Sequence, residues 1–217
     1  MPFRNRQDAG RQLAARLAAL RETQRWPDPV VLALPRGGIP VAAEVARALD
    51  APLDVLVARK IGVPGQPEVG IGAIAGDDPP LFDGRALQVL GITTEDLAPD
   101  VARERAELHR REDLYRRGRA APSVRDRTVI LVDDGLATGV TARSALRRIR
   151  AERPAAVILA VPVGATQAVE ELGGDADQVV CLRPDRYLHA IGAWYDDFHQ
   201  VPDQEVIDIL EHQAAPH

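Results

Sequence analysis

Two adjacent carboxylates followed by a turn of glycines and threonines are the part of this chain whose residue types best suit chemistry. Asp133 and Asp134, called the acid pair below, directly follow the apolar run 129–132, and the turn 135–141 follows them. Neighbouring carboxylates raise each other's pKa unless a cation or hydroxyl donors lie against them. Glycine lets the backbone approach a ligand closely and threonine adds a hydroxyl, so the turn suits an anion.

The surroundings of the acid pair predict a ligand with two chemically different ends. The pattern in 141–152 predicts a helix, and the free N–H groups at a helix start favour a phosphate. Sugar hydroxyls match the carboxylates, so a ribose 5-phosphate fits both ends. The alternatives are an acidic turn before a threonine N-cap, and a phosphoryl-acceptor site. The second would need another acidic pair after the first predicted strand, where residues 35–38 read Pro-Arg-Gly-Gly.

Apolar runs separated by helical patterns predict strands and helices that alternate along the chain. Predicted strands cover 30–34, 53–58, 69–75, 128–132, 156–163 and 178–182, and predicted helices cover 5–25, 40–49, 94–117, 141–152 and 166–172. Residues 77–92 read as turns. Short continuous apolar runs are typical of strands buried on both faces, so we predict an α/β fold with a mostly parallel central sheet and helices on both faces.

Ligands of such folds bind beyond the carboxyl ends of the strands. The loops 35–38, 60–68 and 133–141, and the segment after residue 182, should therefore gather at one edge. The length fits a single domain over 1–217. We expect a core at about 28–182, a helical insertion at about 93–119, and a small C-terminal hood at about 183–205 that lies together with the N-terminal helix.

Composition narrows the classes of protein that this chain can represent. A net charge of −5 argues against a general nucleic-acid or anionic-membrane surface. Cys181 is the single cysteine, so no disulfide forms within the chain, and its apolar neighbours predict a buried structural thiol. The N-terminus lacks the apolar core of a signal peptide and no apolar run reaches membrane-spanning length, so we expect a cytoplasmic protein.

The run 129–142 resembles the signature of type I phosphoribosyltransferases that binds 5-phosphoribosyl-1-pyrophosphate (PRPP): two acids, three further residues, then Thr-Gly-x-Thr. The resemblance implies Mg²⁺-assisted transfer of the phosphoribosyl group to a nucleobase nitrogen, with release of pyrophosphate. It also implies that Asp133 and Asp134 hold the ribose hydroxyls and, largely through substrate and water, the Mg²⁺. The implied ribose 5-phosphate loop, called the phosphate loop below, consists of Gly135, Leu136, Ala137, Thr138, Gly139, Val140 and Thr141.

Residues 35–38, called the arginine loop below, resemble the pyrophosphate loop of the same family. Arg36, Gly37 and Gly38 would bind the diphosphate, and the resemblance predicts a cis peptide bond before Arg36. Lys60 ends the next predicted strand and, with Arg36, would stabilise the leaving group. The loop 62–67 stands where the family has its mobile lid. A plain strand-to-helix turn and a solvent-exposed lysine are the alternatives.

The segments 182–187 and 192–197 resemble the hood of hypoxanthine–guanine phosphoribosyltransferases. That resemblance implies that Tyr187 stacks on the base and that Asp196 lies near the Mg²⁺–pyrophosphate, with Trp194 in the hood. Packing of Trp194 onto the core is the alternative. Ala137 stands where hypoxanthine enzymes have a third acid, so the acceptor base is not identified.

Two further alternatives concern activity and partners. A PRPP-sensing regulator could share this fold without catalysis. The stretch 103–119, which contains most of the predicted helix 94–117, also has seven arginines, at 103, 105, 110, 111, 116, 117 and 119. Four acids are interspersed among them, which favours a solvated face or a subunit contact over a nucleic-acid surface. We therefore expect a homodimer whose ligands are PRPP and a nucleobase-like molecule.

Overall fold

The centre of the molecule is a five-stranded parallel sheet with the order β2-β1-β6-β7-β8. The structure, a computed structural model, describes residues 2–214, apart from the side chains of residues 67, 68 and 214. The strands are β1 (Val30–Ala33), β2 (Leu53–Val55), β6 (Thr128–Val132), β7 (Ala156–Ala165) and β8 (Gln178–Asp185). The predicted parallel sheet is confirmed.

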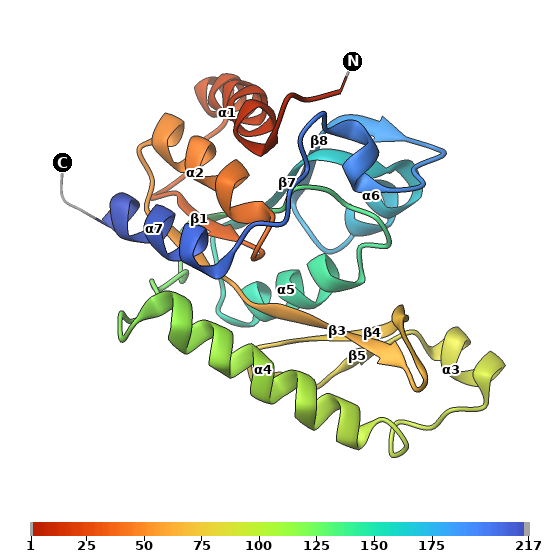
Figure 1. Cartoon of the computed structure of the whole chain (residues 1–217). Coiled ribbons are helices and arrows are strands. Elements are labelled where there is room, and N and C mark those ends of the chain that lie inside the picture. The colour runs from red at the N-terminus through yellow and green to blue at the C-terminus, as the bar shows by residue number, and fades with distance from the viewer. Residues whose placement is uncertain (1, 215–217) are drawn as a thin grey trace.

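Helices cover both faces of this sheet because successive strand residues point to opposite sides. One face packs against α1 (Arg6–Thr23), α2 (Gly38–Leu49) and α7 (Asp203–Ala214). The other face packs against α5 (Val140–Ala151) and α6 (Thr166–Leu172). Figure 1 shows the two layers of helices on either side of the sheet. The predicted α/β class is therefore confirmed.

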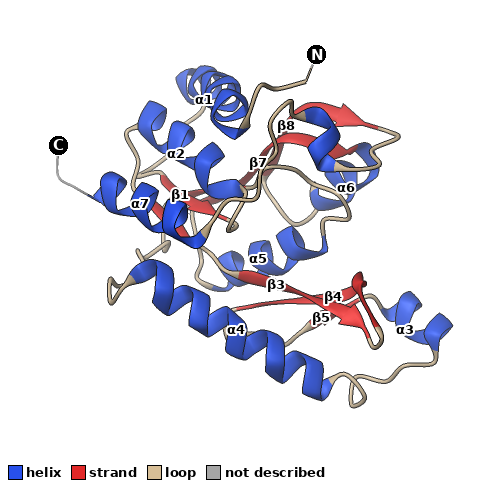
Figure 2. Cartoon of the chain, viewed as in Figure 1, coloured by secondary structure: helices blue, strands red, loops and turns tan. Residues whose placement is uncertain are grey.

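A second, antiparallel sheet lies beside α5, and its three strands differ from the sequence prediction. They are β3 (Ala58–Val63), β4 (Gln66–Ala75) and β5 (Leu81–Phe82). The long helix α4 (Ala98–Arg116) and the short helix α3 (Gly84–Leu90) complete this part of the chain, which Figure 2 shows below the central sheet. The prediction of turns alone over 77–92 is wrong, because β5 and α3 lie there.

The segment 53–67 also folds differently from the prediction. The single predicted strand 53–58 divides, since β2 ends at Val55 and β3 begins at Ala58 in the other sheet. The predicted loop 62–67 is mostly strand, with only Pro64 and Gly65 in the turn. Gly65 has a φ of +80°, which a tight turn after proline requires. This hairpin extends from the small sheet where an irregular lid was expected.

The arginine-rich helix, predicted from 94 to 117, begins at Ala98, and several of its arginines anchor it within the molecule. Arg105 donates to the carbonyl of Gly76 at 2.6 Å, and Arg116 lies 3.0 Å from the Asp54 carboxylate. Such contacts explain the abundance of arginine without a nucleic-acid partner. In the part of the chain that the structure describes, no helix combines the length and the apolar composition that crossing a membrane requires.

The hood joins the two ends of the chain. After β8, a 3-10 helix (Ile191–Trp194, η1) leads into a segment that pairs with the N-terminus. Phe3 donates its N–H to the carbonyl of Trp194 at 2.7 Å, and Asp196 donates to the carbonyl of Phe3 at 2.8 Å. The sequence patterns did not predict α7, which follows the hood.

Candidate active site

The acid pair lies at the carboxyl end of β6, directly against the arginine loop that follows β1. The N–H of Asp134 donates to Asp133 Oδ1 at 2.8 Å. A Cβ added to Gly38 would lie 2.8 Å from the carbonyl oxygen of Val132 and 3.0 Å from Asp133 Cα. Only glycine allows so close an approach. The structure therefore brings together two loops that are about a hundred residues apart in the sequence, and the peptide bond between Pro35 and Arg36 is cis, as predicted.

A cavity of about 370 Å³ opens beside the acid pair. Its lining consists of Lys60, Gly70, Asp133, Ala142, Ile191, residues 135–139 and Thr141. Most of the predicted phosphate loop thus faces one cavity together with Asp133. Gly139 has a φ of +75° and precedes the first residue of α5, so the loop ends at a helix N-terminus. Free N–H groups there suit a phosphate.

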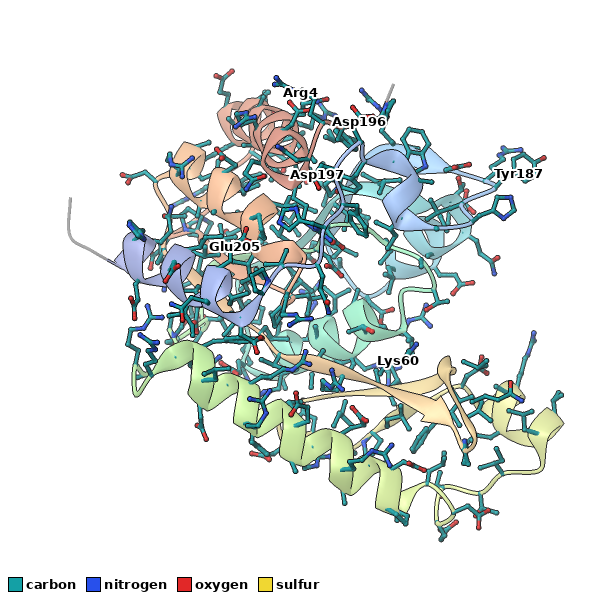
Figure 3. All side chains as sticks on the ribbon, viewed as in Figure 1. Arg4, Lys60, Tyr187, Asp196, Asp197 and Glu205 are labelled. Atoms are coloured by element: carbon teal, nitrogen blue, oxygen red, sulfur yellow. The ribbon has the colours of Figure 1, made fainter. Side chains whose placement is uncertain are left out.

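Two residues fix the walls of this cavity. Leu136 is buried and bridges to β7, since its N–H donates to the carbonyl of Val163 at 2.9 Å. Its side chain therefore anchors the phosphate loop to the core. Lys60, labelled in Figure 3, is exposed on β3. It lines the cavity from the side of the small sheet. Its aliphatic chain lies over Gly70, where an added Cβ would be 2.7 Å from Lys60 Cδ.

The two carboxylates of the acid pair have different surroundings. Burial, followed by the neighbouring charge of Asp134, raises the pKa of Asp133 well above its usual value. Burial also raises the pKa of Asp134, but the Arg6 guanidinium opposes that rise. Arg6 Nε lies 2.8 Å from Asp134 Oδ2. An ionised Asp133 therefore needs a cation or hydroxyl donors, which is the requirement that the sequence suggested.

Arg6 is a site residue that the sequence did not reveal. It is 7% exposed, it donates to the carbonyl of His199 at 2.7 Å, and its guanidinium lies 3.9 Å from the centre of the Phe198 ring. The hydroxyl of Tyr195 donates to the backbone carbonyl of Asp134 at 2.6 Å. The first turn of α1 and the hood thus both contact the acid pair. No local pattern separates Arg6 from the other arginines of the predicted helix.

Arg36 does not line the cavity in this structure. Its guanidinium lies 3.6 Å from Asp203 at the start of α7, and Asp203 accepts a hydrogen bond from the buried Tyr115 at 2.5 Å. Burial and this hydrogen bond raise the pKa of Tyr115. Arg36 is therefore paired with a partly exposed carboxylate at the start of α7. Gly37 is the member of the arginine loop that faces Asp134, because a Cβ there would overlap its carboxylate.

The predicted base-binding residues lie outside the cavity. The Tyr187 side chain is 81% exposed and points away from the core (Figure 3), while Trp194 Nε1 donates to Asp185 at 3.2 Å. Asp196 is exposed and its backbone pairs with the N-terminal segment. The hood residue that does reach the cavity is Ile191, which packs so closely on Gly135 that a Cβ there would lie 2.4 Å from it.

The donor set fits a magnesium ion that is held mainly by substrate and water. Among the side chains that the structure describes, no three of His, Cys, Asp or Glu gather as a metal site. Mg²⁺ is commonly bound through one or two carboxylates together with substrate phosphates and water. Asp133 lines the cavity with hard oxygen donors and a raised pKa that a cation would offset. Asp133 is thus the member of the acid pair that would face such an ion, whereas Asp134 is paired with Arg6.

Fold and cavity together define an α/β protein in which the acid pair and the phosphate loop lie beside a cavity at the carboxyl edge of a parallel sheet. The chain belongs to the phosphoribosyl transferase family, because the family described as "Phosphoribosyl transferase domain" matches residues 5–194. It is 44% identical over 209 residues to Rv0571c of Mycobacterium tuberculosis, which is named provisionally as a phosphoribosyl transferase. That match covers 96% of this chain and 46% of Rv0571c, so the chain spans about half the length of the curated relative.

Two solved structures share the fold. TT1426 from Thermus thermophilus is similar with a TM-score of 0.81 and 42% identity, over 99% of this chain and 100% of that one. AQ2163 from Aquifex aeolicus has a TM-score of 0.52 at 13% identity, over 83% of this chain and 74% of that one. The second likeness concerns the fold alone.

Proposed function

We propose that the chain transfers the phosphoribosyl group of PRPP to a nitrogen of a nucleobase-like acceptor and releases pyrophosphate, with the help of Mg²⁺. The observation that supports this most is the cavity that Asp133, the phosphate loop and Lys60 line together. The arginine loop packs against the acid pair beside it. Family membership supports the same class of reaction.

In the proposed complex, each part of the site has a separate task. Backbone N–H groups of the phosphate loop and the hydroxyls of Thr138 and Thr141 bind the 5-phosphate at the start of α5. Asp133 accepts hydrogen bonds from the ribose hydroxyls. Lys60 binds the diphosphate and stabilises the negative charge that grows on it as it leaves, and Arg36 joins it on exchanging its contact with Asp203 for the diphosphate.

The proposed step exchanges one bond at the anomeric carbon for another. The bond from this carbon to the pyrophosphate oxygen breaks, and its electron pair leaves with pyrophosphate. The acceptor nitrogen forms the new bond with its lone pair and loses its proton to solvent. Positive charge grows on the ribose, as in other glycosyl transfers, and the carboxylates stabilise it. When bound, Mg²⁺ supplies positive charge beside the diphosphate oxygens.

The hood completes the proposed site through movement. Tyr187 would stack on the acceptor base once the hood closes, Trp194 would support the hood, and Asp196 would approach the metal-bound diphosphate. Exposed in this structure, Tyr187 is available for such a contact. Stacking of an aromatic side chain on a base contributes about 1–3 kcal/mol.

The test is to incubate the protein with PRPP, Mg²⁺ and a panel of nucleobases while pyrophosphate release is followed. Turnover with at least one base is expected, and a double variant Asp133→Asn, Asp134→Asn should lose it. Normal turnover by that variant would remove the acid pair from the mechanism. Ribose 5-phosphate soaked into crystals should occupy the phosphate loop.

A PRPP sensor without catalysis is the second candidate. The observation that favours it is the ion pair between Arg36 and Asp203, which gives the proposed leaving-group cation a partner within the chain. Titration calorimetry separates the two: a sensor binds PRPP but releases no pyrophosphate with any base. Absence of PRPP binding would contradict both candidates.

A further inference from the structure

Arg6 forms an ion pair with Asp134, so the two carboxylates of the acid pair have different partners. Arg6 Nε lies 2.8 Å from Asp134 Oδ2, and Arg6 Nη1 donates to the carbonyl of His199 at 2.7 Å. The face of the guanidinium lies over Phe198 at 3.9 Å. With 7% exposure, Arg6 has its charge committed to Asp134 and to the hood. A buried arginine needs such partners, because an unpaired buried charge is costly.

Asp134 is enclosed on its other sides as well. Its side chain, 13% exposed, lies so close to Gly37 that an added Cβ would be 1.9 Å from Oδ2. Tyr195 donates its hydroxyl to the backbone carbonyl of Asp134 at 2.6 Å. Asp133, in contrast, lines the cavity with the phosphate loop. The two acids therefore have the same chemistry but different access to a ligand.

We infer that Arg6 is a positioning residue that divides the acid pair: it neutralises Asp134 and ties it to the hood, leaving Asp133 as the carboxylate presented to the sugar. This inference rests on the proposed function. Without Arg6, Asp134 would be an uncompensated charge beside Asp133 and beside the loop proposed for the diphosphate. Repulsion of a multiply charged anion such as PRPP would follow.

Two other roles for Arg6 predict different behaviour. If both acids bind the sugar equally, Asp134→Asn should weaken PRPP binding as much as Asp133→Asn does. If Arg6 only ties the N-terminal helix to the hood, removing Asp134 cannot compensate for its loss, because the contacts with His199 and Phe198 are still missing. A rescue experiment distinguishes these roles.

The experiment measures PRPP affinity by titration calorimetry at one fixed Mg²⁺ concentration for four variants: Arg6→Gln, Asp134→Asn, the double variant of these two, and Asp133→Asn. Arg6→Gln should weaken binding about tenfold to a hundredfold, the range for a lost charge-assisted hydrogen bond. Asp134→Asn should weaken it less than Asp133→Asn. The double variant should return to the affinity of Asp134→Asn, a non-additive result that shows direct coupling.

Two control variants test whether a change in PRPP affinity comes from the loss of the Arg6 charge. Arg21→Gln removes another arginine of α1, one that donates to the carbonyl of Leu49 at 2.6 Å, and should leave PRPP affinity unchanged. Arg6→Lys keeps the positive charge and should therefore bind PRPP more tightly than a variant with a neutral residue at this position. It takes the place of Arg6→Gln if circular dichroism shows that Arg6→Gln does not fold. A double variant as weak as Arg6→Gln overturns this inference alone, whereas wild-type protein that does not bind PRPP overturns the proposed function with it.

Discussion

Replacing Gly37 by alanine changes the free energy of unfolding through two effects of opposite sign. Gly37 has φ −62° and ψ −31°, which alanine adopts without strain. At such positions, Gly→Ala usually stabilises a protein by about 0.4–1 kcal/mol, because the unfolded chain loses freedom. The backbone conformation alone therefore predicts that Gly37→Ala is more stable than the wild type.

The surroundings of Gly37 predict the reverse. An added Cβ would lie 1.9 Å from Asp134 Oδ2, 2.5 Å from its Cγ and 3.2 Å from Arg6 Nε. The carboxylate must move, which costs about 1–3 kcal/mol for overpacking. Movement also weakens the ion pair with Arg6, and a hydrogen bond to a charged group contributes about 1.5–3 kcal/mol. These costs exceed the backbone gain, so we expect a net loss of about 2–5 kcal/mol.

Calorimetric unfolding measures this loss. For a chain of this length, each kcal/mol changes Tm by about 2–4 °C, so Gly37→Ala should lower Tm by roughly 4–20 °C. Gly84→Ala at the start of α3 is the matched control, since no atom lies within 4 Å of the added Cβ, and its Tm should stay or rise slightly. In an Asp134→Ala background, which already lacks the carboxylate that the added Cβ would meet, Gly37→Ala should lower Tm by less than it does in the wild type. A Gly37→Ala variant as stable as the wild type would refute the close packing of the two loops.

Three further predictions concern the acid pair, the thiol and the hood. Burial raises the pKa of Asp133 in the folded protein. The ionised Asp133 therefore lowers the free energy of unfolding at pH values above this raised pKa. This destabilisation disappears when the pH falls below 3.8, the pKa of the carboxyl in the unfolded chain. In calorimetric unfolding, Asp133→Asn should therefore raise Tm at about pH 8 but not at about pH 3. An unchanged Tm at the higher pH would contradict the destabilising effect of an ionised Asp133. Burial raises the pKa of Cys181 from 9.0 to about 11, so iodoacetamide should label it about a hundredfold more slowly than a free cysteine at about pH 8, and at the ordinary rate in urea. Tyr187→Ala should leave Tm unchanged because the side chain is exposed, yet raise the KM for the acceptor about 5- to 150-fold if it stacks on the base.

The central sheet and the two loops were predictable because their signals are local. Each buried strand is a short continuous apolar run, and a parallel sheet brings the carboxyl ends of its strands to one edge. The acid pair and the arginine loop each follow such a strand directly, so their meeting follows from topology. Register between β1 and β6, Ala33 opposite Val132, then brings the loops into contact.

The small sheet was predicted less well because its signals are ambiguous. Leu53 through Ala58 is a nearly continuous apolar run, and nothing in it marks the point where the chain leaves one sheet for the other. Glycine and proline in 62–67 suggest a loop, whereas the same residues also permit a hairpin turn. Pairing partners decide between these outcomes, and β4 supplies them.

The role of Arg6 could not be predicted from the sequence, because it depends on partners from distant parts of the chain. Asp134 is 128 residues away and His199 is 193 residues away. The same carboxylate excludes a side chain at Gly37 and pairs with Arg6, so these three positions form one packing unit. A change at any of them therefore alters the environment of the other two. Because the unit also includes a backbone carbonyl of the hood, the position of the hood and the charge of the acid pair depend on each other.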